Sequence, residues 1–162
     1  MGVSNVRGKF TEFEGSFTLN DKSKNLEAMS GTVKVASIDT GHKDRDGHLT
    51  TKNKKTGKFE FFNPEASAEI SFKMAEYVGP GTYARLTGTL TMNGKSKPIT
   101  IGVQMFGVAE DPWGNQRAGF SGNATINRKD FDLVYDGKLK SGKSSVGDSI
   151  TIQLEIEGIL KK

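Results

Sequence analysis

The sequence predicts an all-β fold, and three observations support this prediction. First, the 162 residues include 20 glycines against 4 prolines, together with 10 phenylalanines, a composition that favours strands joined by tight turns. Second, apolar and polar residues alternate in two successive runs within residues 82–108, as in strands with one buried face. Third, Asn93-Gly94 separates these two runs, and this dipeptide is the strongest short hairpin signal.

The hairpin over residues 82–108 is expected to have one apolar face that is buried (the dry face) and one polar face that is exposed to solvent. A two-residue turn would pair Leu86 with Ile101, and a four-residue turn would pair Leu86 with Val103. Both registers place the apolar rows of the two strands on the same face, whereas a one-residue slip would expose one row. Gly88 lies on the dry face, where its missing side chain suggests room for a ligand to pass.

The same alternation predicts further strands on both sides of the hairpin. They span residues 6–19, 27–38, 69–77, 117–126 and 150–160. Phe10 is out of step with Phe13, which predicts a bend or bulge near Glu12. A turn is expected at Gly79-Pro80-Gly81. Residues 39–58 are polar and too many for a hairpin loop, so we expect a crossover there, with one short helix or an irregular segment.

Length, charge and cysteine content limit the class of protein. The chain fits one domain, residues 1–162, and basic residues exceed acidic ones by 23 − 19 = 4, which does not imply an anionic partner. The absence of cysteine excludes disulfides and thiol chemistry. No apolar run approaches the ~20 residues of a membrane span, so stable membrane insertion is not expected. The N-terminus lacks an apolar signal core; the chain as written is therefore expected to be soluble, with its compartment undetermined.

About seven strands with one polar face each are not expected to form a flat sheet, because the apolar face of such a sheet would be exposed to water. Such a sheet curls into a barrel or folds into a sandwich. Small residues on the predicted inner face allow either tight packing or room for a ligand. These residues are Gly31, Ala84, Gly88, Ala118, Gly122 and Ala124.

Seven segments, none specific alone, match a known family when taken in order. They are Ser4–Gly15, Arg45–Leu49, Phe61-Phe62 with Pro64 and Phe72, Leu86–Val103, Asp111–Phe120, Thr125–Phe131 and Val146–Glu157. Together they resemble the YceI-like family, whose lipocalin-like members bind polyisoprenoid or other long amphiphilic lipids. The resemblance implies an antiparallel lipocalin-like barrel of about seven or eight strands. It also implies a carrier or storage protein whose ligand is a polyisoprenoid or fatty-acid-like lipid, with no enzymatic activity and no other cofactor. Family members are often periplasmic.

Three departures from the family pattern affect these expectations. A first strand that usually precedes the segment matching residues 1–7 is absent, which would leave neighbouring strand edges unpaired. We therefore expect a homodimer, closed by swapped or shared strands; the alternative is a gap that remains open. The span between Leu49 and Phe61 is longer and more basic than expected. Asp132 stands where the family usually has glycine.

The expected ligand-binding residues form two groups. The apolar wall comprises Phe10, Phe13, Phe17, Val33, Val35, Leu49, Phe61, Phe62, Phe72, Leu86, Leu90, Ile101, Val103, Phe120, Ile126, Phe131, Ile152 and Leu154. A buried alkyl chain gains about 0.8 kcal/mol per CH₂, so only a few polar groups are needed to hold the headgroup. The headgroup candidates are Arg7, Arg45, Asp46, His48 and Arg128. For these five, the alternative role is surface salt bridging.

Other functional classes receive less support from the residues. His42, Asp44, Asp46 and His48 alternate and would share one face of an extended strand, as ligands of a divalent metal could. The alternative is a polar segment whose aspartates cap a helix, and we expect no metal site. With both histidines in one loop and no cysteine, no nucleophile–base pair is indicated. The alternative function is that of a nucleic-acid-binding or a purely structural small β-barrel without lipid. The aromatic residues lie mainly on the apolar face of the predicted strands, so no nucleic-acid partner is expected.

Overall fold

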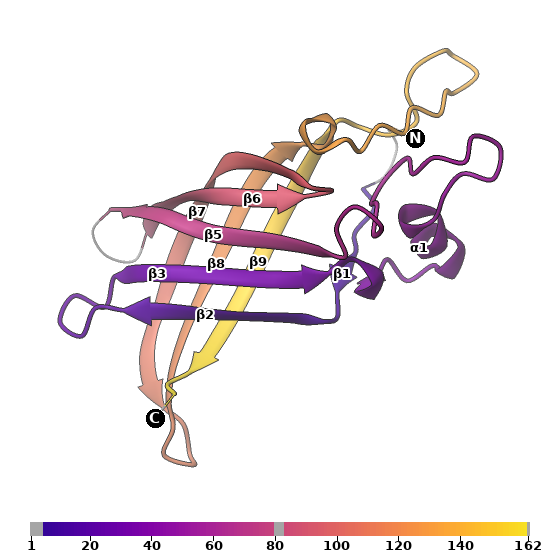
Figure 1. The fold of residues 1–162 in the computed structure, drawn as a ribbon. Coiled ribbons are helices and arrows are strands. Elements are labelled where there is room, and N and C mark those ends of the chain that lie inside the picture. Colours follow the sequence, from indigo (N-terminus) through magenta and orange to yellow (C-terminus); the bar gives the residue numbers. More distant parts are fainter. Residues whose placement is uncertain (1–4, 80–82, 162) are drawn as a thin grey trace.

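The computed structural model describes residues 5–79 and 83–161, which form an antiparallel β-structure with one α-helix (Figure 1). A two-stranded sheet consists of β1 (Lys9–Phe10) and β4 (Ile38–Asp39). The strands of the main sheet are β2 (Phe13–Leu19), β3 (Leu26–Lys34), β5 (Glu69–Val78), β6 (Tyr83–Met92), β7 (Lys95–Glu110), β8 (Gln116–Asn127) and β9 (Ser149–Ile159). The helical elements are α1 (Lys43–Thr50) and the 3₁₀ turns η1 (Val35–Ser37) and η2 (Arg128–Phe131).

The main sheet is a meander in the order β2-β3-β5-β6-β7-β8-β9. It curls so that β2, β3, β5 and β6 form one wall, while β7, β8 and β9 cross behind them (Figure 1). The apolar side chains fill the space between the two walls. This arrangement confirms the predicted antiparallel, lipocalin-like architecture.

The central hairpin adopts the two-residue turn. Met92 pairs with Lys95 and Leu86 pairs with Ile101 along β6 and β7. Asn93 and Gly94 have φ angles of 52° and 73°, as a type I′ turn requires. Pro80 and Gly81 of the other expected turn lie outside the described residues.

The strand predicted over residues 27–38 was too long. β3 ends at Lys34 because the Ser37 hydroxyl donates a hydrogen bond to the Lys34 carbonyl at 2.8 Å, which closes the η1 turn. Ser37 Oγ also accepts a hydrogen bond from the Glu12 amide at 3.1 Å. This contact lies where the chain passes from β1 into β2 and changes its pairing partner, which confirms the bend near Glu12.

The predicted crossover is confirmed, and α1 begins one residue before Asp44. The segment between β4 and β5 covers one end of the curled sheet, together with the irregular segment after η2 (Figure 1). The turn residue Asn93 is bonded to the first of these segments and to the end of η2. Its side-chain amide donates to the Phe61 carbonyl at 2.9 Å and to the Phe131 carbonyl at 3.1 Å. No helix among the described residues has the length and apolar character needed to cross a bilayer.

The core consists of two clusters that share three half-buried residues, Phe72, Ile99 and Ile152. The first cluster, beside the covered end, is built on Val35, Ile70, Leu90, Met92, Ile126, Phe131 and Leu133. The second, toward the other end, is built on Leu26, Leu86, Ile101, Val103, Phe120 and Ala124. The interpretation of Gly88 as room for a ligand was wrong. A β-carbon there would lie 2.3 Å from the Phe72 ring, so the ring occupies the space.

Candidate functional site: the interior of the curled sheet

The structure gathers most of the predicted wall residues inside the curled sheet. Those that are buried are Val35, Leu86, Leu90, Ile101, Val103, Phe120, Ile126 and Phe131. Those that are half-buried are Phe10, Phe17, Val33, Phe61, Phe62, Phe72, Ile152 and Leu154. Leu49 is also half-buried, but it lies on α1 and belongs to neither core cluster. Phe13 differs, because its side chain is 74% exposed at the free edge of β2.

The two edge strands approach each other through side chains. The Phe17 ring on β2 meets the buried Phe120 ring edge-on, with centroids 5.3 Å apart. It also occupies the space beside Gly158 of β9, where a β-carbon would lie 2.5 Å from the ring. In the described part of the chain, no hydrogen-bonded ladder joins β2 to β9. The contacts described between these two edges are therefore made by side chains.

Tyr77 is a polar residue of the interior that sequence reasoning missed. Its ring packs with the second core cluster, and its hydroxyl is buried without a hydrogen-bond partner. Alternation from Ile70 through Met74 would point Tyr77 outward. A β-bulge between Met74 and Glu76 reverses the parity and turns Tyr77 inward. Burial raises the pKa of the phenol, so the hydroxyl remains protonated and free to donate.

The lining around Tyr77 is adaptable. Met29, Met74 and Met105 are half-buried and pack against the second cluster. Methionine side chains are unbranched and polarisable, and they repack readily around irregular shapes. This end of the interior can therefore change its shape around a guest more easily than the Phe131 end.

The five headgroup candidates lie apart from Tyr77, on elements at the covered end of the sheet (Figure 1). Arg7 is exposed before β1, and Arg45 is half-buried on α1. Asp46 accepts hydrogen bonds from the Thr40 amide and hydroxyl at 2.9 and 2.6 Å. It thereby ties α1 to the preceding loop.

His48 belongs to an aromatic group on the same end. Its ring meets Phe61 and Tyr135 edge-on at 5.3 and 5.2 Å, and the latter two rings are stacked at 4.9 Å. His48 Nε2 lies 3.5 Å from Glu60 Oε2. This group joins α1 to the irregular segment that follows η2.

Arg128 is buried, with only 2% of its side chain exposed. Its guanidinium donates to the Gly147 carbonyl and to Asp148 Oδ1, both at 2.9 Å, and also to the Leu133 carbonyl. These contacts hold the long segment between β8 and β9 against the sheet. Each of its three nitrogens thus donates a hydrogen bond within the protein.

The alternating His42, Asp44, Asp46 and His48 do not form an extended strand. They lie at the start of and within α1, where residues two apart point to different sides of the helix. Among residues 5–79 and 83–161, no group of three or more His, Asp or Glu side chains is arranged to hold a metal ion. Asp44 gives no side-chain cap either, since the helix N-cap is His42 without a side-chain hydrogen bond.

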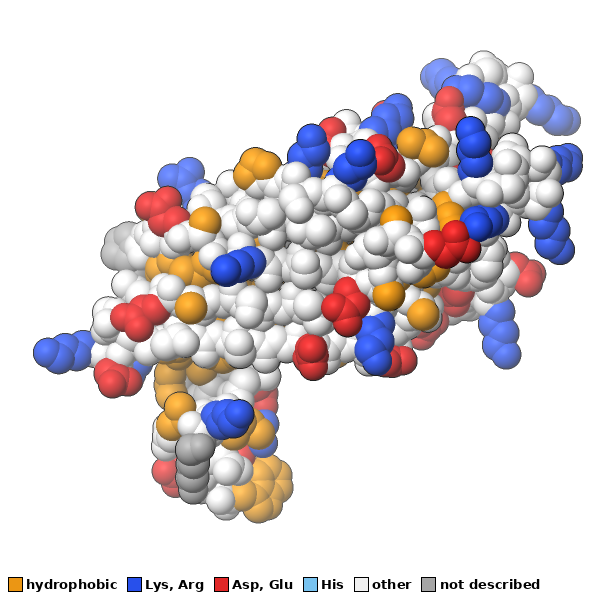
Figure 2. All heavy atoms as spheres, in the orientation of Figure 1, with side chains coloured by type: hydrophobic (Ala, Val, Ile, Leu, Met, Phe, Trp, Pro, Cys, Tyr) orange, Lys and Arg blue, Asp and Glu red, His pale blue; other side chains and the backbone are white. Residues whose placement is uncertain are grey.

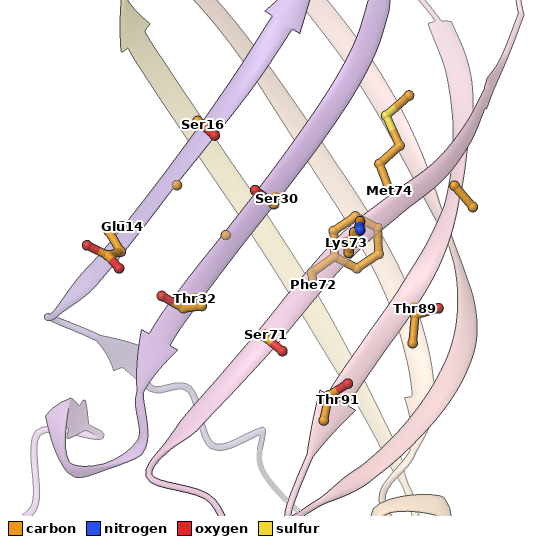
Figure 3. Close-up of a pocket in the computed structure, with 13 residues that line it drawn as sticks. Glu14, Ser16, Ser30, Thr32, Ser71, Phe72, Lys73, Met74, Thr89 and Thr91 are labelled. Carbon is orange, nitrogen blue, oxygen red and sulfur yellow. The ribbon is translucent and has the colours of Figure 1, made fainter.

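A separate hollow of about 870 Å³ lies over β2, β3, β5 and β6 (Figure 3). Its polar side chains stand in two rows across the strands, and both rows point away from the core. One row comprises Ser16, Ser30, Lys73 and Thr89, and the other comprises Glu14, Thr32, Ser71 and Thr91. Hydroxyl groups and one pair of opposite charges, Glu14 and Lys73, line this hollow together with Phe72, Met74 and Ala75.

Comparison with known proteins gives the same assignment from sequence and from structure. The model of the YceI-like domain matches residues 1–158. A UPF0312 protein of Pseudomonas aeruginosa is 36% identical over 159 residues, which cover 98% of this chain and 76% of that protein. A UPF0312 protein of Photorhabdus laumondii is 35% identical over 162 residues, or 100% of this chain and 78% of that protein. Neither name states an enzymatic activity.

Solved structures with the same fold extend this agreement. The crystal structure of the Campylobacter jejuni YCEI protein is 28% identical, with a TM-score of 0.83 over 100% of this chain and 89% of that one. The structure of Burkholderia cenocepacia BcnA shares the fold, with a TM-score of 0.73, 23% identity and coverage of 96% and 89%. The chain therefore belongs to the YceI-like family.

Proposed function

We propose that the protein binds a long-chain amphiphile, either a polyisoprenoid or a fatty-acid-like lipid, inside the curled sheet and acts as its carrier or store. The unpartnered Tyr77 hydroxyl is the observation that carries the proposal. A buried hydroxyl without a partner costs about 1–3 kcal/mol, and a ligand oxygen beside it would remove that cost. The surrounding side chains are apolar and suit a hydrocarbon chain.

The edges of the sheet supply the path for the ligand. The inward residues of β9, from Ile150 to Ile156, are only half-buried, and Phe13 on β2 is exposed. A chain entering between β2 and β9 would cover these apolar surfaces. Each CH₂ group buried there contributes about 0.8 kcal/mol, so a long tail needs few polar contacts.

Organic extraction of the purified protein tests the proposal directly. The full chain is purified without detergent, extracted with solvent, and the extract is analysed by mass spectrometry. We expect one class of amphiphile with a long alkyl or isoprenoid chain, in near-stoichiometric amount. Protein from several hosts and growth conditions that yields no amphiphile would contradict the proposal.

Replacing Tyr77 with phenylalanine is expected to separate ligand binding from stability. The Tyr77→Phe variant loses a hydroxyl that has no partner in the protein, so the free energy of unfolding should stay constant or rise by about 1 kcal/mol. Affinity for the extracted lipid should fall about fivefold, because a hydrogen bond contributes about 1 kcal/mol to binding. Urea unfolding and lipid titration measure the two quantities.

Tyr135→Phe is the matched control, because Tyr135 stacks on Phe61 at the opposite end. This variant should leave lipid affinity unchanged. If Tyr77→Phe lowered stability and left affinity intact, Tyr77 would be a structural residue and not a ligand contact.

A further inference from the structure

The large apolar side chains that are exposed gather at one end of the molecule, opposite α1. They lie where β5, β7 and β9 end and where β6 and β8 begin. The members are Val78, Tyr83, Phe106, Val108, Trp113, Ile159 and Leu160. Across the described ranges 5–79 and 83–161, the other exposed large apolar residues are Val6, Phe13 and Val134. A gathering of this kind marks an interaction site more often than scattered exposed residues do.

The β7–β8 hairpin carries the centre of this group beyond the rest of the sheet. It projects past β2 in Figure 1, and hydrophobic side chains are seen at its tip in Figure 2. Trp113 at the turn is 79% exposed, and Phe106 is 62% exposed. The hairpin therefore places its largest apolar groups farthest from the core.

Both faces of the projecting hairpin carry apolar side chains, beside polar ones such as Glu110 and Arg117. Val108 pairs with Ala118, whose side chain points inward. Phe106 is the extra residue of a β-bulge, and its ring lies 3.6 Å from the β-carbon position of Gly119, on the outward side. A partner protein with one flat surface would cover only one of these faces. A fluid apolar medium would surround both.

The turn that carries Trp113 is firmly built. Asp111 Oδ1 accepts hydrogen bonds from the Trp113 and Asn115 amides, both at 2.9 Å, and Arg117 Nε donates to Asp111 Oδ2 at 2.7 Å. Burial alone would raise the pKa of Asp111, but hydrogen bonds from Asn115, Arg117 and Trp113 outweigh it and hold the pKa well below its usual range. The exposed tryptophan is thus presented by a fixed turn.

Charges on the hairpin and on the opposite end differ. Arg117 is bonded to Asp111 and to Glu157, so the hairpin offers no free basic cluster. Lys161 lies beside Leu160, but seven lysines gather in the loops of the covered end, at Lys52, Lys54, Lys55, Lys58, Lys138, Lys140 and Lys143. Electrostatic attraction to anionic lipids would therefore act mainly at the covered end of the molecule, away from this hairpin.

We infer that the β7–β8 hairpin docks the protein on the surface of a lipid bilayer, with Trp113 and Phe106 entering the interfacial region. Tryptophan prefers this region because its ring is amphipathic. Apolar groups buried at the headgroup boundary give reversible binding to the surface without spanning the bilayer. The docking depends on the side chains of the hairpin and does not require the proposed lipid cargo.

The emission of Trp113 is a direct probe, because it is the only tryptophan in the sequence. The full chain is titrated with phosphatidylcholine vesicles, with and without phosphatidylglycerol, at low and high salt. We expect a blue shift with neutral vesicles that survives high salt, and quenching by lipids brominated on the acyl chain. Phe106→Ser should weaken partitioning about tenfold, since burial of an aromatic side chain is lost while the reporter remains.

Val134→Ser is the matched control, because Val134 is 55% exposed outside this group and its replacement should not change partitioning. Three results would overturn the inference: no emission change with any vesicle, binding only to anionic vesicles and lost in salt, or a blue shift that follows protein concentration without vesicles. The last would show that a second copy of the chain covers the hairpin. If the protein docks on vesicles but yields no extractable lipid, the result would support this inference and contradict the proposed binding of a lipid inside the sheet.

Discussion

Replacing Arg128 with alanine is expected to lower the free energy of unfolding by about 3 kcal/mol or more, because hydrogen bonds from charged donors contribute about 1.5–3 kcal/mol each. The substitution leaves the Leu133 and Gly147 carbonyls without their donor. It also removes the contact that holds Asp148, at the start of β9, beside η2. Urea unfolding followed by circular dichroism measures the change.

Lys129 offers a matched control, because it contacts the same aspartate from the surface. Its Nζ lies 2.7 Å from Asp148 Oδ2, and the two side chains are 53% and 46% exposed. Exposed pairs contribute about 0–1 kcal/mol, so Lys129→Ala should have a small effect. Arg128→Lys should recover little, since an ammonium group cannot reach three separate acceptors. Equal losses in the Arg128→Ala and Lys129→Ala variants would contradict the structural role of Arg128.

Replacing Phe120 with alanine is expected to cost about 3–5 kcal/mol, the range for a buried phenylalanine that leaves a cavity. Phe120 is 0% exposed within the second cluster and supports the Phe17 ring. Its loss should therefore also loosen the contact between β2 and β9. Urea unfolding gives the first effect, and faster amide hydrogen exchange in β2 gives the second.

Phe13→Ala is the control on the same edge strand, because Phe13 is 74% exposed. Substitutions at such positions usually change stability by less than about 0.5 kcal/mol. A Phe13→Ala variant as unstable as Phe120→Ala would mean that the exposed edge is covered in solution.

The central hairpin was predictable because local and tertiary signals agree there. Asn93-Gly94 tolerates the positive φ angles of a type I′ turn, and both candidate registers put the apolar residues on one face. The two registers could not be separated by this pattern, since both satisfy it. In the observed register, the Asn93 side chain donates hydrogen bonds to the Phe61 and Phe131 carbonyls. The alternation of apolar and polar residues does not predict these contacts.

The site was less predictable, and the reasons are physical. Tyr77 was missed because one β-bulge reverses the inward and outward directions of the side chains that follow Met74 in β5. The sequence gives little indication of such a bulge. Gly88 was misinterpreted because the ring of Phe72, two residues along β5 from its ladder partner Met74, occupies the space that glycine leaves. The departure at Asp132 has a clearer basis: its φ is 58°, a left-handed conformation in which glycine is unstrained and aspartate is tolerated.

The meander of the main sheet has a consequence for the order in which the protein folds. Every ladder joins strands that follow one another along the chain, apart from the excursion between β3 and β5. The β6–β7 hairpin can form first, and β5 and β8 can then add to it with short loop closures. β3 and β9 follow across the long segments 35–68 and 128–148. β2 and β9 are the edge strands of this sheet, so we expect them to be the last to join and the first to detach in local unfolding. The proposed path of the lipid thus crosses the part of the sheet that we expect to be least cooperative, which can open while the centre stays folded.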